Sequence, residues 1–300
     1  MKQEFQTLEL RKALERSLGF RLKSLVRLDG ASAINFRAER ESDGLVFAVK
    51  CSPPSRQVMF DHLVRHLEEV KGTKAVRRLF EGECPSRFAG YNLVCLSWCP
   101  GERLFPDRLT DGQMKDFLDD YLVFSAAMQK ATGIVPHDPV PEWRADVLSR
   151  CGTAGGRLLR RLILRDIPVE SVTYRAERLR VVHGDFHHGN FLFTGGRVSG
   201  YFDLEEFCEG YPADDIVRYF VCAAEHLRWY EQHRKRRLLE LFAFAVRYLP
   251  YPRDEWHVAL NCLLMRKIYM KTHHRRIGLG QTLNLLYRAG FYRRLRSLCA

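Results

Sequence analysis

No stretch of this 300-residue sequence approaches the roughly 18 consecutive apolar residues that a membrane-spanning helix needs. The first twenty residues, MKQEFQTLELRKALERSLGF, alternate charged and apolar side chains, as an amphipathic helix does. They lack the uninterrupted apolar segment of a secretory signal. We therefore expect a soluble, cytoplasmic protein. Its 46% apolar residues are enough for a full hydrophobic core, in one large domain or two lobes.

The sequence also lacks several short signatures. Its nine cysteines are odd in number and scattered, which favours free thiols in a reducing compartment. The closest two, Cys95 and Cys99, have no second pair to complete a zinc site. Neither an internal repeat nor a low-complexity tract is present. The absence of GxxxxGK[ST] excludes an enzyme with a Walker-type phosphate loop.

Acidic residues are scarce in the last quarter of the chain. From residue 221 onward, sixteen Lys and Arg face five Asp and Glu, so this quarter carries eleven of the twelve net positive charges. Two interpretations stay open. The charges are either solvated helix faces, or they form a surface that attracts phosphate, an acidic sugar, lipid headgroups or RNA.

Turn signals and β-rich runs alternate in the first hundred residues. Residues 24–40 predict two strands joined by a Gly/Ser turn, 44–51 a third strand, and 91–99 a strand that stops at Pro100. Between them, 55–70 predicts a helix, because Phe60, Leu63, Leu67 and Val70 form one apolar stripe.

The pattern then becomes helical. Residues 111–133 predict a helix with Asp111 as N-cap, and 140–180 are helical in character. Short β segments return at 181–203, and helices follow from 213 to the end. The prediction is an α+β chain with a small β-rich lobe (1–96), a hinge (97–101) and a large helical lobe (102–300).

A cluster of histidines stands in VVHGDFHHGNFLF, residues 181–193. A zinc site is disfavoured there, because His187 and His188 on an extended segment point to opposite sides. A metal shared by His62 and His66 is disfavoured as well, because no third ligand is evident.

Asp185, Asn190 and Asp203 suit phosphoryl transfer from Mg·ATP instead. One carboxylate can accept the proton of the acceptor hydroxyl, while an amide and a second carboxylate offer the hard oxygens that Mg²⁺ prefers. A hairpin built on TGGR, residues 194–197, would bring Asn190 and Asp203 face to face.

These residues carry a resemblance. HGDFHHGNFLF, followed by VSGYFDLEEFCEGYPADDIV, resembles the signature of the aminoglycoside phosphotransferase and choline kinase family, which has a bilobal protein-kinase-like fold. Gly210, Pro212, Asp215 and Ile216 match its last part in register. The resemblance covers residues 181–217 and implies an ATP- and Mg²⁺-dependent small-molecule kinase, with a small antiparallel β lobe holding one main helix and a large, mostly helical lobe.

The resemblance also implies roles within the matched segment. Asp185 is similar to the family's catalytic base, Asn190 to its metal-binding amide and Asp203 to its main Mg²⁺ ligand. His183, which we place with Asp185 in the catalytic set, would orient the loop together with His187. Asp215 would pin or cap the following helix.

The remainder of the nucleotide site lies in the first hundred residues. Lys50, at the end of VFAVK, is the candidate for holding the α/β-phosphates. A helical acid would pair with it, and Asp61, Glu68 and Glu69 are all candidates, Asp61 suiting the register best. Backbone amides near Gly30 and Ser32 would meet phosphate. The backbone near Ser97 and Cys99 would meet adenine.

The acceptor is the open question. The family phosphorylates hydroxyls of small molecules and sugars, and cationic acceptors call for acidic pockets. The basic last quarter therefore predicts an anionic acceptor or one linked to a glycolipid, with peripheral contact to an anionic membrane or a phosphorylated substrate. An aminoglycoside-type antibiotic kinase is one alternative. A weak kinase-like protein whose basic region binds an anionic membrane or, less expected, nucleic acid is another.

Overall fold

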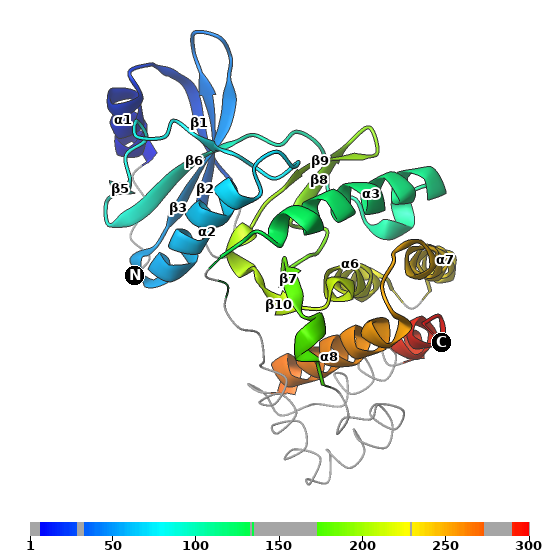
Figure 1. The fold of residues 1–300 in the computed structure, drawn as a ribbon. Helices are drawn as coiled ribbons and strands as arrows, with labels where there is room; N and C mark the ends of the chain where they lie inside the picture. The colour runs from blue at the N-terminus through cyan, green and yellow to red at the C-terminus, as the bar shows by residue number, and fades with distance from the viewer. Residues whose placement is uncertain are drawn as a thin grey trace.

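Two lobes meet along a short connector in the computed structural model, in which residues 7–28, 33–132, 134, 173–228, 230–272 and 290–299 are described (Figure 1). The helix predicted over 140–180 lies almost entirely outside the described residues, and so does the turn that holds Gly30 and Ser32. None of the helices in the described part of the chain is long and apolar enough to cross a membrane.

An antiparallel sheet forms the first lobe, as predicted. Five of its strands follow in the spatial order β1 (Leu22–Leu28), β2 (Ile34–Arg40), β3 (Val46–Ser52), β6 (Tyr91–Ser97) and β4 (Arg78–Leu79). A sixth strand, β5 (Arg87–Phe88), also pairs with β6. The buried positions of the long strands include Phe36, Phe47 and Val49, aromatic and β-branched side chains that fit a pleated, half-buried surface. Helix α1 (Thr7–Leu18) covers one face with Leu10, Leu14 and Leu18.

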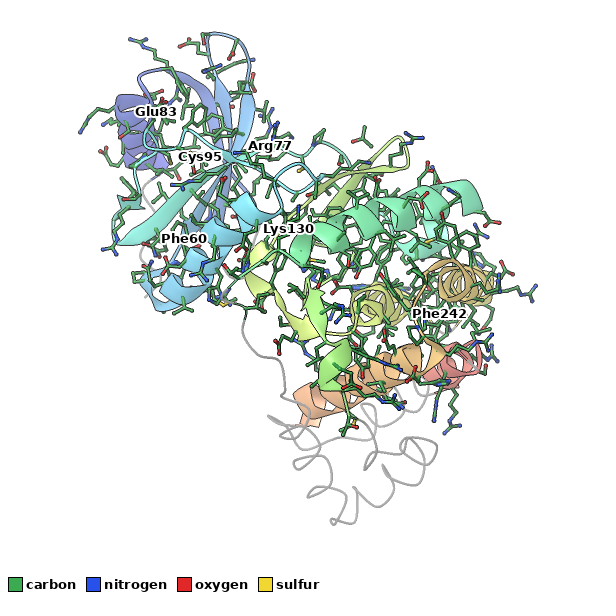
Figure 2. All side chains as sticks on the ribbon, in the orientation of Figure 1. Phe60, Arg77, Glu83, Cys95, Lys130 and Phe242 are labelled. Atoms are coloured by element: carbon green, nitrogen blue, oxygen red, sulfur yellow. The ribbon has the colours of Figure 1, made fainter. Side chains whose placement is uncertain are left out.

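Helix α2 (Gln57–Glu69) lies between the sheet and the helical lobe (Figure 1). The predicted apolar stripe is confirmed, but its buried members belong to the core of the second lobe. Leu63 and Leu67 pack in one cluster with Tyr121 and Phe124. Figure 2 shows the two cores apart, with Cys95 inside the first lobe and Phe242 inside the second. Helix α2 therefore shares apolar burial with the second lobe, together with Val94 and Leu96 of β6, which belong to the same cluster.

The second lobe is mainly helical. Its long helices among the described residues are α3 (Asp111–Met128), α6 (Pro212–His226), α7 (Gln232–Tyr248) and α8 (Arg253–Thr272), and residues 290–297 are helical as well. Two short pairs of strands lie between α3 and α6, namely β7 (Arg180–Val182) with β10 (Cys208–Gly210), and β8 (Phe191–Thr194) with β9 (Arg197–Tyr201). The predicted N-cap Asp111 is wrong by one residue. Thr110 is the cap, because its hydroxyl accepts from Gln113 N while the Gln113 side chain accepts from Thr110 N.

Part of the basic last quarter is neutralised within the fold. Arg234 lies 2.6 Å from Asp107, and Arg237 lies 2.7 Å from Asp111. These pairs join α7 to the segment that leads into α3. These two arginines are paired within the fold, so they are neither solvated charges on a helix face nor a free anion-binding surface.

Candidate active site

The loop of residues 183–190, here called the HGD loop, is held in place by helix α6. Strand β7 ends at Val182, directly before the loop. Asp215 on α6 accepts hydrogen bonds from His183 N at 2.9 Å and from Gly184 N at 3.2 Å. Tyr121 donates to the same carboxylate at 3.2 Å. Asp215 therefore fixes the start of the loop. The cap that the resemblance allows for Asp215 is made by its neighbour Asp214, which accepts from Tyr211 N at 2.7 Å.

Gly184 sits where only glycine fits. Its φ is +76°, and a Cβ there would lie 2.1 Å from the backbone oxygen of Glu206. We expect Gly184→Ala to lower the free energy of unfolding by more than about 1 kcal/mol, because alanine cannot adopt this conformation without strain. Chemical denaturation checks this.

Gly112→Ala is the matched control for that variant. Gly112 lies in the first turn of α3, and a Cβ there meets nothing within 4 Å. Helix propensity predicts a small stabilisation at this position, up to about 1 kcal/mol. Equal effects of the two substitutions would contradict the proposed strain at Gly184.

The Asp185 carboxylate is held by three side chains. Arg218 Nη1 donates to Oδ1 at 2.8 Å, while His187 Nε2 and Asn190 Nδ2 lie 3.3 and 3.2 Å from Oδ2. Burial alone would raise the pKa of Asp185. The His187 hydrogen bond and the Arg218 charge outweigh burial and hold the pKa well below its ordinary value. Asp185 is therefore an ionised carboxylate. Its side chain is 41% exposed, so solutes can reach it.

The histidines of the loop play different parts. His183 is fully buried, with Nδ1 accepting from Asp185 N and Nε2 3.0 Å from the Phe202 oxygen. His187 accepts from Gly189 N through Nδ1, which leaves Nε2–H to donate to Asp185. His188 turns away and packs on Phe105, with ring centroids 4.2 Å apart. Burial, followed by neighbouring positive charge, lowers the pKa of His188 to about 4.

These orientations bear on the metal question. His187 and His188 do not converge, as the sequence predicts. Among the described residues, no group of three or more His, Cys, Asp or Glu side chains could hold a metal ion. His62 and His66 share no third ligand there. His66 is instead an interlobe contact, fully buried, with Nδ1 2.8 Å from the Leu204 oxygen and its ring stacked on Phe207.

The predicted hairpin is confirmed. Strands β8 and β9 are joined by Gly195 and Gly196, both at positive φ, with Thr194 opposite Arg197. Beyond the paired strands, Phe202 N donates to the main-chain oxygen of Asn190 at 3.0 Å. Asp203 follows Phe202 directly, so this backbone bond brings Asp203 close to Asn190. Asp203 itself has a left-handed φ of 60°, a conformation that aspartate tolerates better than most residues.

Lys50 is joined to the second lobe by two carboxylates. Its Nζ lies 2.9 Å from Asp203 Oδ1 and 2.5 Å from Glu205 Oε1. Lys50 and Glu205 are each 7% exposed. Burial by itself would lower the pKa of Lys50, but the charges of Glu205 and then Asp203 outweigh it and raise that pKa. The lysine is therefore charged and firmly positioned.

The prediction that Lys50 pairs with an acid of helix α2 is wrong. Asp61 accepts from Gln57, Glu68 lies 3.5 Å from Lys71, and Glu69 accepts from Thr132. These three acids face other partners. The pair of Lys50 comes instead from the short 3₁₀ turn η5 (Leu204–Glu206), directly after Asp203.

Of the two residues predicted to present their backbone to adenine, Ser97 and Cys99, the structure leaves only the second available. Ser97 N donates to the Arg77 oxygen at 2.8 Å, and Ser97 Oγ accepts from Arg77 N. This backbone N–H is therefore committed to the sheet. Cys99 packs against Gly200, where a Cβ would lie 1.9 Å from the Cys99 sulfur. The backbone of residues 98–99 stays the candidate for the adenine edge.

Comparison with known proteins decides the family. The model of the phosphotransferase enzyme family matches residues 25–249, three quarters of the chain. The chain belongs to this family. It is an enzyme of the small-molecule kinase class, which transfers phosphate to a hydroxyl group. The resemblance read from the 181–217 segment is thereby confirmed for most of the chain. No curated protein matches this phosphotransferase in sequence.

Solved structures confirm the protein-kinase-like fold of this phosphotransferase. An amicoumacin kinase in complex with AMP-PNP, Ca²⁺ and Ami superposes with a TM-score of 0.65 at 12% identity, covering 98% of this chain and 94% of the other. The spectinomycin phosphotransferase APH(9)-Ia, in complex with ADP and spectinomycin, gives 0.65 and 12% over 99% of both chains. ADP-bound APH(2'')-Ib gives 0.55 and 15%, covering 98% and 99%.

Two residues of the site are missing from the sequence prediction. Arg218 follows Asp215 by three positions and so lies on the same face of α6, a spacing that the sequence displays. Glu205 follows Asp203 by two positions. Its pairing with Lys50, which is 155 residues away, has no local signal in the sequence.

Proposed function

We propose that this phosphotransferase moves the γ-phosphoryl group of Mg·ATP to a hydroxyl of a small molecule or sugar, with Asp185 as the catalytic base. One observation carries the proposal. A continuous set of polar contacts runs from Lys50 to Asp203, then through the Phe202–Asn190 backbone bond to Asn190, and from Asn190 to Asp185. The groups that a phosphate donor and a hydroxyl acceptor need are therefore adjacent, although they come from distant parts of the chain.

The donor set fits magnesium. Asp203 uses Oδ1 for Lys50, its side chain is 44% exposed, and its other oxygen has no partner among the described residues. Asn190 donates through Nδ2 to Asp185, which leaves its amide oxygen as a ligand. One or two protein oxygens are typical for Mg²⁺ that arrives with nucleotide phosphates. When bound, the ion would neutralise charge on the β- and γ-phosphates.

The remaining residues have distinct tasks in this proposal. Lys50 holds the α/β-phosphates and is itself kept in place by Glu205. Asp185 orients the acceptor hydroxyl and takes its proton as the new P–O bond forms. Arg218 and His187 keep Asp185 ionised and fix its direction. His183 positions the loop backbone and does not exchange protons with the acceptor, because both of its ring nitrogens face the backbone.

Label transfer tests the proposal. The protein is incubated with γ-labelled ATP and a panel of neutral, cationic and anionic hydroxyl compounds, with Mg²⁺ or with excess EDTA. We expect label on at least one acceptor, ADP in equal amount, and loss of both products with EDTA. Label found only as inorganic phosphate across the panel would contradict acceptor phosphorylation. Transfer that persists in EDTA would contradict the metal assignment.

A further inference from the structure

Two cysteine side chains touch in the first lobe, although they are eleven positions apart in the sequence. The Sγ atoms of Cys84 and Cys95 lie 3.1 Å apart, and both side chains are free thiols joined by a hydrogen bond. A disulfide bond is about 2.05 Å long, so the two sulfur atoms are only about 1 Å from bonding distance. Cys95 is fully buried in the core of the lobe, whereas Cys84 is half-buried. A small solute can therefore reach one member of the pair.

The segment that carries Cys84 is fixed by its own backbone and by one aromatic side chain. It follows strand β4 and begins at Phe80, which has a left-handed φ of 55°. Glu83 N and Cys84 N both donate to the Phe80 oxygen, at 3.1 and 2.8 Å. The Phe80 ring packs on Phe47 of the core, with ring centroids 5.1 Å apart. The fold therefore holds Cys84 beside Cys95 before any bond forms between them.

The two thiols differ in acidity, as the members of a reactive pair do. Hydrogen bonds with Cys95 lower the pKa of Cys84, and burial opposes them. The positive charge of Arg78, which also pairs with Glu81 at 3.1 Å, lowers the pKa of Cys84 further. The hydrogen bond with Cys84, followed by burial, raises the pKa of Cys95, so Cys95 keeps its proton and donates it to the bond. Because the thiolate is the form that attacks oxidants, Cys84 is the nucleophile of the pair.

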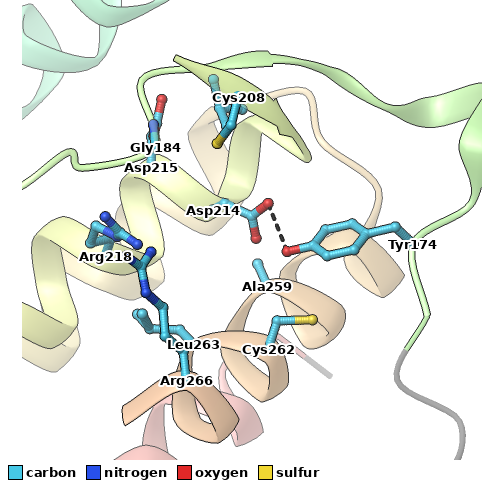
Figure 3. Close-up of a pocket in the computed structure, with 11 residues that line it drawn as sticks. Tyr174, Gly184, Cys208, Asp214, Asp215, Arg218, Ala259, Cys262, Leu263 and Arg266 are labelled. Atoms are coloured by element: carbon cyan, nitrogen blue, oxygen red, sulfur yellow. Dashed lines mark hydrogen bonds between the residues drawn. The ribbon is translucent and has the colours of Figure 1, made fainter. Parts of the chain in front are cut away.

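Cys208 and Cys262 of the second lobe provide a contrast. Both line a pocket beside the HGD loop, but they stand on β10 and α8, and Figure 3 shows Asp214 between their side chains. Burial also raises the pKa of Cys208, which keeps this thiol protonated and unreactive. Nearness to a common pocket therefore does not make these two thiols a pair. Cys84 and Cys95 combine direct contact between their sulfur atoms with a lowered pKa on the more accessible side.

We propose that Cys84 and Cys95 form an oxidation site, at which hydrogen peroxide converts the two thiols into a reversible disulfide. The Cys84 thiolate attacks one peroxide oxygen, so an S–O bond forms, the O–O bond breaks and hydroxide leaves. The Cys95 sulfur then attacks Cys84 Sγ, so the S–S bond forms and the S–O bond breaks. The hydroxyl group leaves with the Cys95 proton as water. Two electrons pass from the sulfur atoms to the peroxide, and a dithiol reductant restores both thiols by exchange.

The new bond would join strand β6 to the segment that follows β4. Cys95 lies opposite Val49 of β3 in the sheet, so the bond closes beside the strand that carries Lys50. Because the crosslink restricts the unfolded chain, the oxidised first lobe should be harder to unfold. Oxidation here is independent of phosphoryl transfer, because neither cysteine has a role in the proposed mechanism.

Peptide mapping of the full-length protein tests the site. Reduced protein is treated with an equimolar amount of hydrogen peroxide, the remaining thiols are alkylated, and the chain is cleaved with trypsin in the absence of reductant. Cleavage after Arg87 places Cys84 and Cys95 on separate peptides, 79–87 and 88–103. We expect mass spectrometry to find these two peptides joined, lighter by two hydrogen atoms than the sum of their free forms. A dithiol reductant should separate them.

Cys99→Ser is the matched control, because Cys99 lies on the same peptide as Cys95. The crosslink should persist in Cys99→Ser and be lost in both Cys84→Ser and Cys95→Ser. A crosslink formed through Cys99 or Cys51 instead would overturn the proposal. So would alkylation of both Cys84 and Cys95 in peroxide-treated wild type, or recovery of Cys84 as a sulfinic or sulfonic acid while Cys95 is alkylated.

Denaturant unfolding shows whether the bond fits the folded lobe. Peroxide-treated wild type should unfold at a higher denaturant concentration than reduced wild type, because its unfolded chain carries the crosslink. Cys84→Ser should unfold at the same concentration before and after peroxide treatment. An equal or lower unfolding midpoint for oxidised wild type would contradict a disulfide that forms within the native structure.

Discussion

Asp185→Asn is expected to lower kcat for phosphoryl transfer about 10²- to 10⁴-fold, the contribution typical of a positioned general base. Asparagine keeps the size of the side chain, and its oxygen can still accept from Arg218, so the HGD loop should keep its shape. The variant loses the group that accepts the hydroxyl proton. KM for ATP should change little, because the proposal places Lys50 and Asp203, and not Asp185, at the nucleotide end of the site. Steady-state kinetics with the best acceptor of the panel measures both constants.

Asp61→Asn is the matched control for this experiment. Asp61 is an exposed acid on α2 whose contact is with Gln57 one turn away. The substitution makes the same chemical change outside the site and should leave kcat within about twofold, as expected for a surface change. A rate for Asp185→Asn within a factor of a few of wild type would remove Asp185 from the role of base. Equal loss of kcat in both variants would indicate a general effect on the fold.

Lys50→Ala is expected to be the most destabilising change among the nucleotide-binding residues. It leaves Glu205 as a buried carboxylate without its cation, and breaking a buried pair from one side typically costs about 3–5 kcal/mol. ATP binding should also weaken, because the proposal gives Lys50 the role of the positive partner of the phosphates. Denaturant unfolding and nucleotide titration give the two readouts separately.

A second substitution shows which acid is the true partner. Lys50→Ala combined with Glu205→Gln should recover much of the lost stability, because no unpaired buried charge is left, while ATP binding stays weak. Lys50→Ala combined with Glu68→Gln should recover nothing, because Glu68 is exposed and faces Lys71. Recovery with Glu68 and not with Glu205 would restore the helix α2 pairing and contradict the observed one.

The sequence predicts the parts of this site that depend on local chemistry. The TGGR turn specifies a hairpin because Gly195 and Gly196 supply the positive φ values that a two-residue turn needs. The strands around Lys50 follow from β-rich runs between turns. The stripe of Leu63 and Leu67 identifies a helix, although periodicity alone does not say which core the helix joins.

The contacts that the sequence does not predict are long-range choices between equivalent side chains. Three acids on α2 and three in the DLEE segment are candidates to pair with Lys50, and only the packing of η5 against α2 selects Glu205 beside Asp203. His66 illustrates the selection, since its bond to the Leu204 oxygen fixes η5. Arg218 was predictable as a residue on the Asp215 face of α6. Its contact with Asp185 required the fold.

One measurement tests the central claim most directly, namely the fate of the γ-phosphate of labelled ATP in wild type and Asp185→Asn side by side, with Mg²⁺ and the acceptor panel. The account predicts that wild type places the label on an acceptor hydroxyl with one ADP formed for each transfer. Asp185→Asn should do so at least a hundredfold more slowly while binding ATP normally. Equal transfer by the two proteins, or label released only as inorganic phosphate by wild type, would contradict it.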